Sequence, residues 1–260
     1  MTTLRITDRT WLSSFEASLG GRIPTWFASF DSSEANIDLG YQTQVSAVFS
    51  SNIEGNTIDL NTFMNLRLAK GKFRQQKEVL EIEELVAAYT LAQQTVPDEA
   101  NCLKAHRILS KSILTRTAQG RYRTDRTGVF SEQGLVYLAV EPEFVEREMK
   151  ELFADIHVLL SERLSVVEAF YFSALLHLKF VHIHPFADGN GRMARLLEKW
   201  FLASSLGEEC WKLPSEKYYR EHQAEYYRNI NLGVNYYELD YSRCLPFLQM
   251  LPHCLSTREL

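Results

Sequence analysis

The stretch His182–Arg195, "HIHPFADGNGRMAR", places two histidines, an aspartate, a Gly-Asn-Gly turn and two arginines within fourteen consecutive residues. Residues 164–182 before it predict one long apolar helix, and helical spacing resumes over 191–206. The loop between them is therefore expected at a helix amino terminus. Free backbone N–H groups and the positive end of the helix dipole favour an anion there.

The side chains of this loop are suited to phosphate chemistry. Arg192 and Arg195 are three residues apart in the first turn of the second helix, so they share a face beside the anion site. Asp188 offers the kind of oxygen ligand that Mg²⁺ takes alongside phosphates and waters. His184 can accept a proton from an attacking hydroxyl, because imidazole titrates near neutral pH. Each residue alone has an ordinary structural interpretation; their concentration in one short loop indicates a functional site.

Composition excludes several other classes of protein. With 28 Lys and Arg against 33 Asp and Glu, the net charge of -5 argues against a nonspecific nucleic-acid binder. The amino terminus shows no secretory signal pattern, and no apolar run resembles a membrane span, so we expect a cytoplasmic chain without a membrane partner. The 4 cysteines form no CxxC pair, which favours reduced thiols over a zinc site.

The chain is expected to be mostly α-helical, with one exception. Apolar residues recur at helical spacing over 43–54, 60–70, 76–94, 99–113, 142–160, 164–182, 191–206, 215–231 and 239–256. Residues 120–140 instead hold three glycines and two β-prone runs, which predict a hairpin inserted between helices. The edge of such a hairpin can bind an extended peptide as an added strand.

The segment "HPFADGNGRMAR", from His184 to Arg195, resembles the motif of the Fic family, H-x-F-x-[D/E]-G-N-G-R-x-x-R, at every specified position. The resemblance covers residues 99 to 235, and "GRYR" from Gly120 is similar to the start of the family's flap hairpin. It implies the Fic fold, a helical bundle with a small hairpin flap at about 120–140. The implied organisation is an amino-terminal helical region (1–98), a catalytic core (99–236) and a helical extension (237–260).

The resemblance also implies an activity and roles for residues. Fic proteins mostly transfer AMP from ATP to a Tyr, Thr or Ser hydroxyl of a protein target. His184 would then deprotonate the hydroxyl, and Asp188 would hold Mg²⁺. The implied phosphate-binding residues are Gly189, Asn190, Gly191, Arg192 and Arg195. The implied flap residues that dock the target are Thr127, Gly128, Val129 and Phe130, while Tyr226 and Tyr227 would wall an adenosine pocket or simply pack in the core.

A second motif, "SSNIEGN" at Ser50–Asn56, could by itself be a helix end capped by Gly55. In a Fic context it resembles the family's inhibitory pattern, [S/T]-x-x-x-E-[G/N]. Glu54, on a helix over about 43–55, would pair bidentately with Arg195 and misalign the phosphates of ATP, with Ser50 anchoring the segment. The same glutamate could instead support removal of AMP from a target.

Three other functions remain open from the sequence. A Fic-fold transferase could use another phosphate-containing donor. A metal-dependent phosphohydrolase could use His182, His184 and Asp188 as ligands, although we interpret His182, on the apolar helix, as structural. A noncatalytic binding module is disfavoured because His184 is present. The sequence does not identify the protein target, which could be the chain itself. It also does not establish whether the chain forms the homodimer that is common among relatives.

Overall fold

The computed structural model describes the chain except for residues 1–3, 20, 35–37, 69–76, 132–133 and 257–260. The described part is mostly helical, as expected, with one two-stranded antiparallel sheet. The helices are α1 (Leu12–Leu19), α2 (Arg22–Glu34), α3 (Leu39–Ile53), α4 (Leu60–Leu68), α5 (Lys77–Ala92), α6 (Glu99–Leu109), α7 (Pro142–Ser161), α8 (Val166–Ile183), α9 (Asn190–Leu206), α10 (Ser215–Glu221), α11 (Gln223–Ile230) and α12 (Leu245–His253). Short 3₁₀ turns η1 (Glu208–Lys212), η2 (Tyr236–Glu238) and η3 (Tyr241–Arg243) complete the list.

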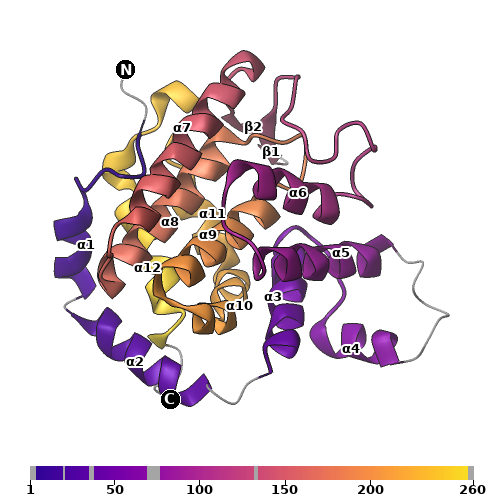
Figure 1. Ribbon diagram of the computed structural model, residues 1–260. Helices are drawn as coiled ribbons and strands as arrows, with labels where there is room; N and C mark the ends of the chain where they lie inside the picture. The colour runs from indigo at the N-terminus through magenta and orange to yellow at the C-terminus, as the bar shows by residue number, and fades with distance from the viewer. Residues whose placement is uncertain (1–3, 20, 35–37, 69–76, 132–133, 257–260) are drawn as a thin grey trace.

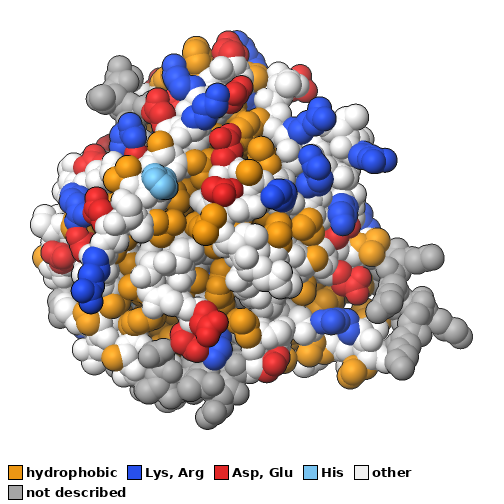
Figure 2. Space-filling view, viewed as in Figure 1, with side chains coloured by type: hydrophobic (Ala, Val, Ile, Leu, Met, Phe, Trp, Pro, Cys, Tyr) orange, Lys and Arg blue, Asp and Glu red, His pale blue; other side chains and the backbone are white. Residues whose placement is uncertain are grey.

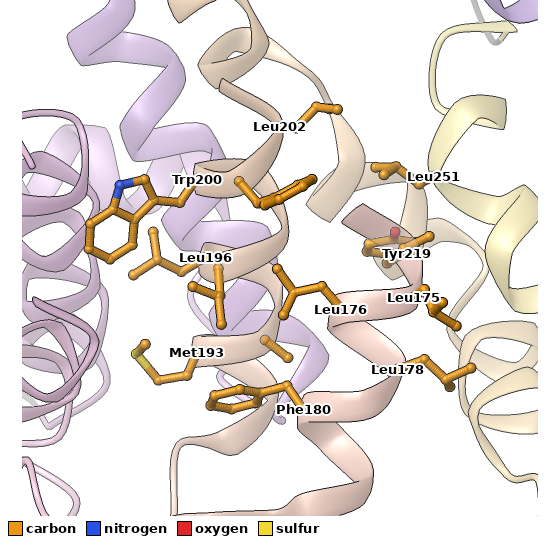
Figure 3. Close-up of a cluster of buried hydrophobic side chains, with 14 of the residues drawn as sticks. Leu175, Leu176, Leu178, Phe180, Met193, Leu196, Trp200, Leu202, Tyr219 and Leu251 are labelled. Atoms are coloured by element: carbon orange, nitrogen blue, oxygen red, sulfur yellow. The ribbon is translucent and has the colours of Figure 1, made fainter. Parts of the chain in front are cut away.

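Helices α8 and α9 pack against each other at the centre of the molecule (Figure 1). Figure 3 shows Leu176 and Phe180 of α8 directed toward Met193 and Leu196 of α9, all of them buried. Helix α8 begins at a capping box in which Ser165 and Glu168 exchange hydrogen bonds. The two helices fix the relative position of the two ends of the loop 184–189.

Helix α8 is long and apolar enough to cross a membrane when judged by length and composition. In the folded chain, however, 83% of its 18-residue span is buried among other elements. Helix α12 contacts another side of α8, and Leu175 and Leu178 point away from α9 (Figure 3). The apolar composition of α8 is therefore explained by its place in the protein core.

Helix α3 lies beside α5 and α10 and also contacts α9. Three of its buried polar residues, Thr43, Ser46 and Ser50, are each hydrogen-bonded to a side chain outside the helix. Gln93 donates to Thr43 at 2.9 Å, and Lys199 of α9 donates to Ser46 at 2.9 Å. This packing fixes the carboxyl end of α3 against the amino-terminal half of α9.

The hairpin pairs β1 (Gly128–Ser131) with β2 (Gly134–Leu138), within the expected range 120–140. A register shift between Val129 and Phe130 interrupts the ladder. Tyr137 anchors the hairpin to α8, because its hydroxyl donates to the His182 carbonyl at 2.6 Å. Residues 120–127 are an irregular segment rather than part of a strand.

Several sequence predictions of helices were wrong in detail. Helices α1 and α2 were not predicted, although residues 1–40 contribute buried apolar side chains such as Phe15 and Phe30. The helix expected over 215–231 is interrupted at His222, which has φ -111° and ψ 35°. The helix expected over 239–256 begins only at Leu245, where Pro246 occupies the first turn and needs no N–H acceptor. The helix expected over 99–113 ends at Leu109, and parts of 60–70 and 76–94 lie outside the described residues.

Candidate active site

The loop between α8 and α9 has a fixed backbone. His184 ends α8 in the left-handed conformation (φ 52°), which is uncommon for a residue other than glycine, and Gly189 precedes α9 in the same region (φ 82°). The Asn190 side chain accepts from the Phe186 N–H at 2.9 Å and donates to the Phe186 carbonyl at 2.8 Å. Asn190 was expected to cradle phosphate; in the structure its side chain holds the loop backbone through these two hydrogen bonds.

The His184 imidazole is placed to act as a base. Its Nδ1 lies 3.3 Å from the carbonyl oxygen of Val181. Because a carbonyl can only accept, Nδ1 carries the proton in this contact and Nε2 carries the lone pair. Burial lowers the pKa of His184, against smaller opposing contributions that include Glu54 and Asp188. The ring is therefore neutral near pH 7.

Arg192 is a buried cation beside the anion site without a hydrogen-bond partner for two of its nitrogens. Its side chain is 6% exposed, and Nε and Nη1 have no hydrogen-bond partner among the described residues. The nearest carboxylates, Glu81 and Asp188, are both 3.7 Å from its guanidinium nitrogens, beyond hydrogen-bond distance. A buried guanidinium with unused donors is costly unless an anion completes it.

Arg195 is almost fully engaged by protein groups. Its Nε donates to the Ser50 hydroxyl at 2.9 Å, and Nη2 donates to the Ser50 carbonyl at 3.0 Å and to Glu54 Oε1 at 2.6 Å. Nη1 donates to the Tyr226 hydroxyl at 3.1 Å. Four of the five N–H groups of this guanidinium are thereby used. The bidentate geometry expected for Glu54 was wrong, because one hydrogen bond joins the two side chains and Ser50 and Tyr226 take the other donors.

The Glu54 carboxylate covers Gly191 in the first turn of α9. A Cβ atom placed on Gly191 would collide with Glu54 Oε1, so only glycine permits this approach. Burial favours the neutral acid, but the charge and hydrogen bond of Arg195, with contributions from Arg192 and His184, lower the pKa of Glu54. Glu54 is therefore ionised and occupies the position where an anion would meet the helix terminus.

Tyr226 belongs to a buried polar chain behind Arg195. His177 Nδ1 contacts Glu198, so the proton lies on that nitrogen and Nε2 accepts from the Tyr226 hydroxyl at 2.9 Å. The Tyr226 oxygen then accepts from Arg195, and Tyr219 donates to Glu198 at 2.9 Å. Sequence reasoning missed His177 and Glu198, which look like ordinary positions of two helices.

Tyr227 plays a different structural part from Tyr226. It is 47% exposed, and its hydroxyl donates to the Ile53 carbonyl at 2.9 Å. Gln223 donates to the same carbonyl at 2.8 Å. Helix α11 therefore binds α3 at Ile53, the last residue of α3 and the one before Glu54. Tyr226, also on α11, contacts Arg195.

A cavity of about 500 Å³ brings these groups together with the hairpin. Its walls include His184, Gly191, Glu54, both tyrosines of α11, and the hairpin residues Val129, Phe130, Val136 and Tyr137. Phe130 is 71% exposed at the rim. Thr127 and Gly128 lie outside this wall: the Thr127 carbonyl accepts from the Ala139 N–H at the base of the hairpin, and Gly128 allows close approach of β2.

Comparison with known proteins agrees with this arrangement. Residues 96–202 match the model of the Fic/DOC family. This part of the chain belongs to that family. The protein adenylyltransferase Fic of Nematostella vectensis is 36% identical over 162 residues, which is 58% of this chain and 35% of the relative. Protein adenylyltransferase fic-1 of Caenorhabditis elegans is 33% identical over 114 residues, 44% of this chain and 20% of the relative. The chain thus spans about a third or less of the length of these two relatives.

Solved structures show the same fold. A crystal structure of a Fic family protein from Desulfovibrio desulfuricans superimposes with a TM-score of 0.74 at 25% identity, covering 95% of this chain and 73% of that one. A Fic domain containing signaling protein from Bacteroides thetaiotaomicron gives 0.68 at 20% identity, covering 90% and 93%. The Fic fold of the described chain is therefore established over nearly its whole length.

Two residues that the sequence did not single out brace the Fic loop. His106 accepts from the Gly120 N–H through Nδ1 at 3.0 Å, so its protonated Nε2 donates to the Asp188 carbonyl at 3.0 Å. Its ring also stacks on Phe186, with centroids 3.6 Å apart. Arg123, 5% exposed, donates to the His184 carbonyl at 2.7 Å and to the Val140 carbonyl beyond the hairpin. These braces connect α6, the hairpin and the loop 184–189.

Asp188 projects into solvent at the mouth of the site, with a side chain that is 55% exposed. Its Oδ1 accepts from the Gly189 N–H at 2.6 Å, which leaves the other oxygen for a cation. One carboxylate with substrate phosphates and waters is a donor set that suits Mg²⁺. The alternative cluster of His182, His184 and Asp188 is wrong as a metal site, because His182 uses both ring nitrogens on Tyr241 and the Ile230 carbonyl. No group of three or more possible ligands was found among the described residues.

Replacing Gly120 with Ala is expected to destabilise the protein strongly. Gly120 has φ +65°, and a Cβ there would lie 2.6 Å from the Leu103 carbonyl and 2.8 Å from Arg107 Cβ. We expect a loss of about 2–4 kcal/mol in the free energy of unfolding, from the backbone strain and the clash together. Gly21→Ala is the matched control, because Gly21 has φ +71° but no atom within 4 Å of its added Cβ. Equal losses in denaturant titrations of the two variants would contradict the clash.

The free energy of unfolding is expected to decrease as the pH is lowered from about 6.5 to about 4. Burial lowers the pKa of His106 and that of His182 to about 4, whereas both titrate near 6.5 in the unfolded chain. Over that interval the unfolded state binds more protons, so each histidine contributes a slope of at most about 1.4 kcal/mol per pH unit. Urea unfolding at about pH 7, 6 and 5 should show this slope, and His106→Gln should reduce it. An unchanged slope in His106→Gln would show that His106 does not contribute.

Proposed function

We propose that this chain is a protein adenylyltransferase that moves AMP from ATP to a hydroxyl of a protein target. Its Fic relatives carry that name, and the side chains around the cavity suit the reaction. The hydroxyl oxygen would form a bond to the α-phosphorus, the bond to the β-phosphate oxygen would break, and pyrophosphate would leave. The hydroxyl proton would pass to His184 Nε2.

The observation that carries this proposal is the incomplete coordination of Arg192. Within the described part of the chain its buried Nε and Nη1 have no hydrogen-bond partner, and they lie beside a helix terminus whose first N–H groups have no intrahelical acceptor. The β- and γ-phosphates would satisfy these donors, with Gly191 allowing close approach and Arg195 joining when it is free. Mg²⁺ held by Asp188 would neutralise charge that develops on the phosphates.

The hairpin would align the target beside His184. Its residues Val129 and Phe130 line the cavity that contains the imidazole, and its edge can pair with an extended segment. Tyr137 and Arg123 hold the hairpin against the Fic loop, so a docked segment would have a defined distance from the base. Positioning and electrostatics would account for most of the rate acceleration.

Glu54 would act as a brake on this reaction. It takes an Arg195 donor and covers Gly191, so the terminal phosphates of ATP could not occupy their productive position. Ser50 holds Arg195 in that arrangement through two hydrogen bonds, and Gln223 with Tyr227 holds the Ile53 carbonyl. The expected effect is loss of alignment of the α-phosphate rather than loss of all affinity for ATP.

Removal of AMP is the second candidate activity, favoured by the ionised state of Glu54. The lowered pKa of this carboxyl leaves a base within the cavity that also contains His184. A carboxylate in that place could orient water toward an AMP ester on the target. Water would form a bond to the phosphorus of that ester, the bond to the target oxygen would break, and AMP would leave while the target regains its hydroxyl.

Labelling with ATP separates the possible donors and reactions. The Glu54→Gly variant, alone and with a cell extract, is incubated with Mg²⁺ and ATP labelled either at the α- or at the γ-phosphate, and the label found with the extract alone is subtracted. AMP transfer predicts that protein-bound label comes only from α-labelled ATP and that a labelled target gains the mass of AMP. Label from the γ-phosphate, or none from ATP but label from another nucleotide, would overturn AMP transfer in favour of another donor. Loss of label from an isolated AMP-modified target would reveal the removal of AMP.

A further inference from the structure

A strongly basic segment borders the catalytic loop of this acidic chain. Residues 102–126 contain seven Lys and Arg and one acidic residue, Asp125, whereas the whole chain has a net charge of -5. Arg123 is buried, and the six exposed cations, here called the basic ridge, are Lys104, Arg107, Lys111, Arg116, Arg121 and Arg126. Figure 2 shows Lys and Arg side chains gathering on the face over α6 and the loop after it.

The basic ridge lacks carboxylate partners of its own. Among the described residues, none of its six members has an ion pair within 4.0 Å, while Arg5, Arg9 and Arg147 each pair with an acid. Three acidic side chains outside this segment have hydrogen-bond partners other than the basic ridge. Asp98 caps α6, Glu99 accepts from Tyr122, and Glu141 accepts from Tyr237. The positive charge of the basic ridge is therefore left to attract a partner from solution.

The position of the basic ridge connects it with the active site. Helix α6 supplies His106, which donates to Asp188, and the Arg123 N–H donates to the Pro185 carbonyl at 2.9 Å. Arg126 is two residues before β1, the strand whose side chains line the cavity. A protein that extends beyond the hairpin on this side would cover the basic ridge.

We propose that the basic ridge docks an acidic surface of the protein target, next to the hydroxyl that receives AMP. This inference rests on the proposed AMP transfer and adds the chemical character of its substrate. Attraction between opposite charges accelerates encounter and orients the partner before the hairpin engages it. ATP has its own anion site inside the loop. A long nucleic acid would also meet the negative remainder of the surface, whereas a compact acidic patch would meet the basic ridge alone.

Synthetic acceptor peptides test the proposal in the Glu54→Gly background. Each peptide carries one Tyr and one Thr in a Gly-Ser segment, followed by a block of Glu in one peptide and of Lys in the other. We expect a KM about 10-fold lower for the Glu peptide, at similar kcat, with the difference shrinking at high salt. The ridge triple variant, which combines Lys104→Glu, Lys111→Glu and Arg116→Glu, should abolish or reverse the preference. The matched control combines Arg67→Glu, Arg163→Glu and Lys217→Glu, three exposed cations outside the basic ridge, and should keep it.

Fluorescence anisotropy of the labelled Glu peptide measures docking independently of catalysis. Salt-sensitive binding that the ridge triple variant loses and the control triple variant keeps would support the proposal, even if no peptide were modified. Equal binding and equal KM for the Glu and Lys peptides would overturn it. Tighter binding of a single-stranded oligonucleotide of equal charge to the basic ridge, without a KM preference between peptides, would overturn it in favour of a nucleic-acid partner. Loss of ATP affinity alone in the ridge variant would assign the basic ridge to nucleotide capture.

Discussion

His184→Ala, introduced into the Glu54→Gly variant, is expected to reduce AMP transfer by about 10²- to 10⁴-fold, the usual contribution of a general base. The lowered pKa of His184 and the contact of its Nδ1 with the Val181 carbonyl leave Nε2 unprotonated toward the cavity. Alanine removes that acceptor and leaves the anion site intact. Single-turnover labelling with α-labelled ATP gives the rate directly.

Two further measurements make this first prediction specific to catalysis. ATP affinity of the His184→Ala variant, measured by thermal shift, should stay within about twofold, because phosphate binding lies with the helix terminus and the arginines. His157→Ala is the control substitution, since His157 is an exposed histidine of α7 and should leave the rate unchanged. A His184→Ala variant that labels at the parental rate would remove His184 from the reaction.

The loop between α8 and α9 could be predicted from the sequence because its parts are contiguous. A helix end, a turn and the next helix start fix where Asp188, Gly191 and Arg192 lie relative to one another, without knowledge of tertiary packing. The two central helices were predicted for the same reason, since their apolar periodicity is local. The start of α9 at Asn190 differs from the predicted 191 by one residue.

The braces of the site could not be predicted because they depend on packing between distant segments. His106 lies 82 residues from the Asp188 carbonyl that it binds, and nothing in its own helix distinguishes it from a core histidine. His177 and Glu198 likewise acquire their meaning only when α8, α9 and α11 meet around Tyr226. The break at His222 matters for the same reason: it separates α10, which packs on α3, from α11, which holds Arg195 and Ile53.

The packing around Arg195 explains why one carboxylate could control the site. Arg195 is 1% exposed and is held on three sides, by Ser50, Tyr226 and Glu54. Among these three partners, only Glu54 is charged. Replacing Glu54 leaves the backbone of α3 in place, because Gln223 and Tyr227 still donate to the Ile53 carbonyl. Removing the carboxylate therefore frees one N–H of Nη2, while the other still donates to the Ser50 carbonyl, and the neighbouring helices stay in place.

Glu54→Gly is accordingly expected to raise AMP transfer by about 10²-fold, the cost of a misplacement of about 1 Å that the brake would impose. Both the uncovered Gly191 and the released Arg195 donor would become available to the phosphates. Glu54→Gln should give a smaller rise, since it keeps the volume over Gly191 while losing the charge. Glu143→Gly, at an exposed position in the first turn of α7, controls for the loss of a glutamate and the gain of a glycine.

Thermal unfolding provides a second measure of the brake that does not depend on a target. Without ATP, Glu54→Gly should unfold at a lower temperature than the parent, because the buried Arg195 loses its ionic partner. With Mg²⁺ and a nonhydrolysable ATP analogue, the variant should gain more stability than the parent, because at equal concentration a tighter ligand stabilises more and an Arg195 donor is then free for phosphate. If the analogue stabilised both proteins equally and the transfer rates were equal, Glu54 would be a structural partner of Arg195 and not a brake.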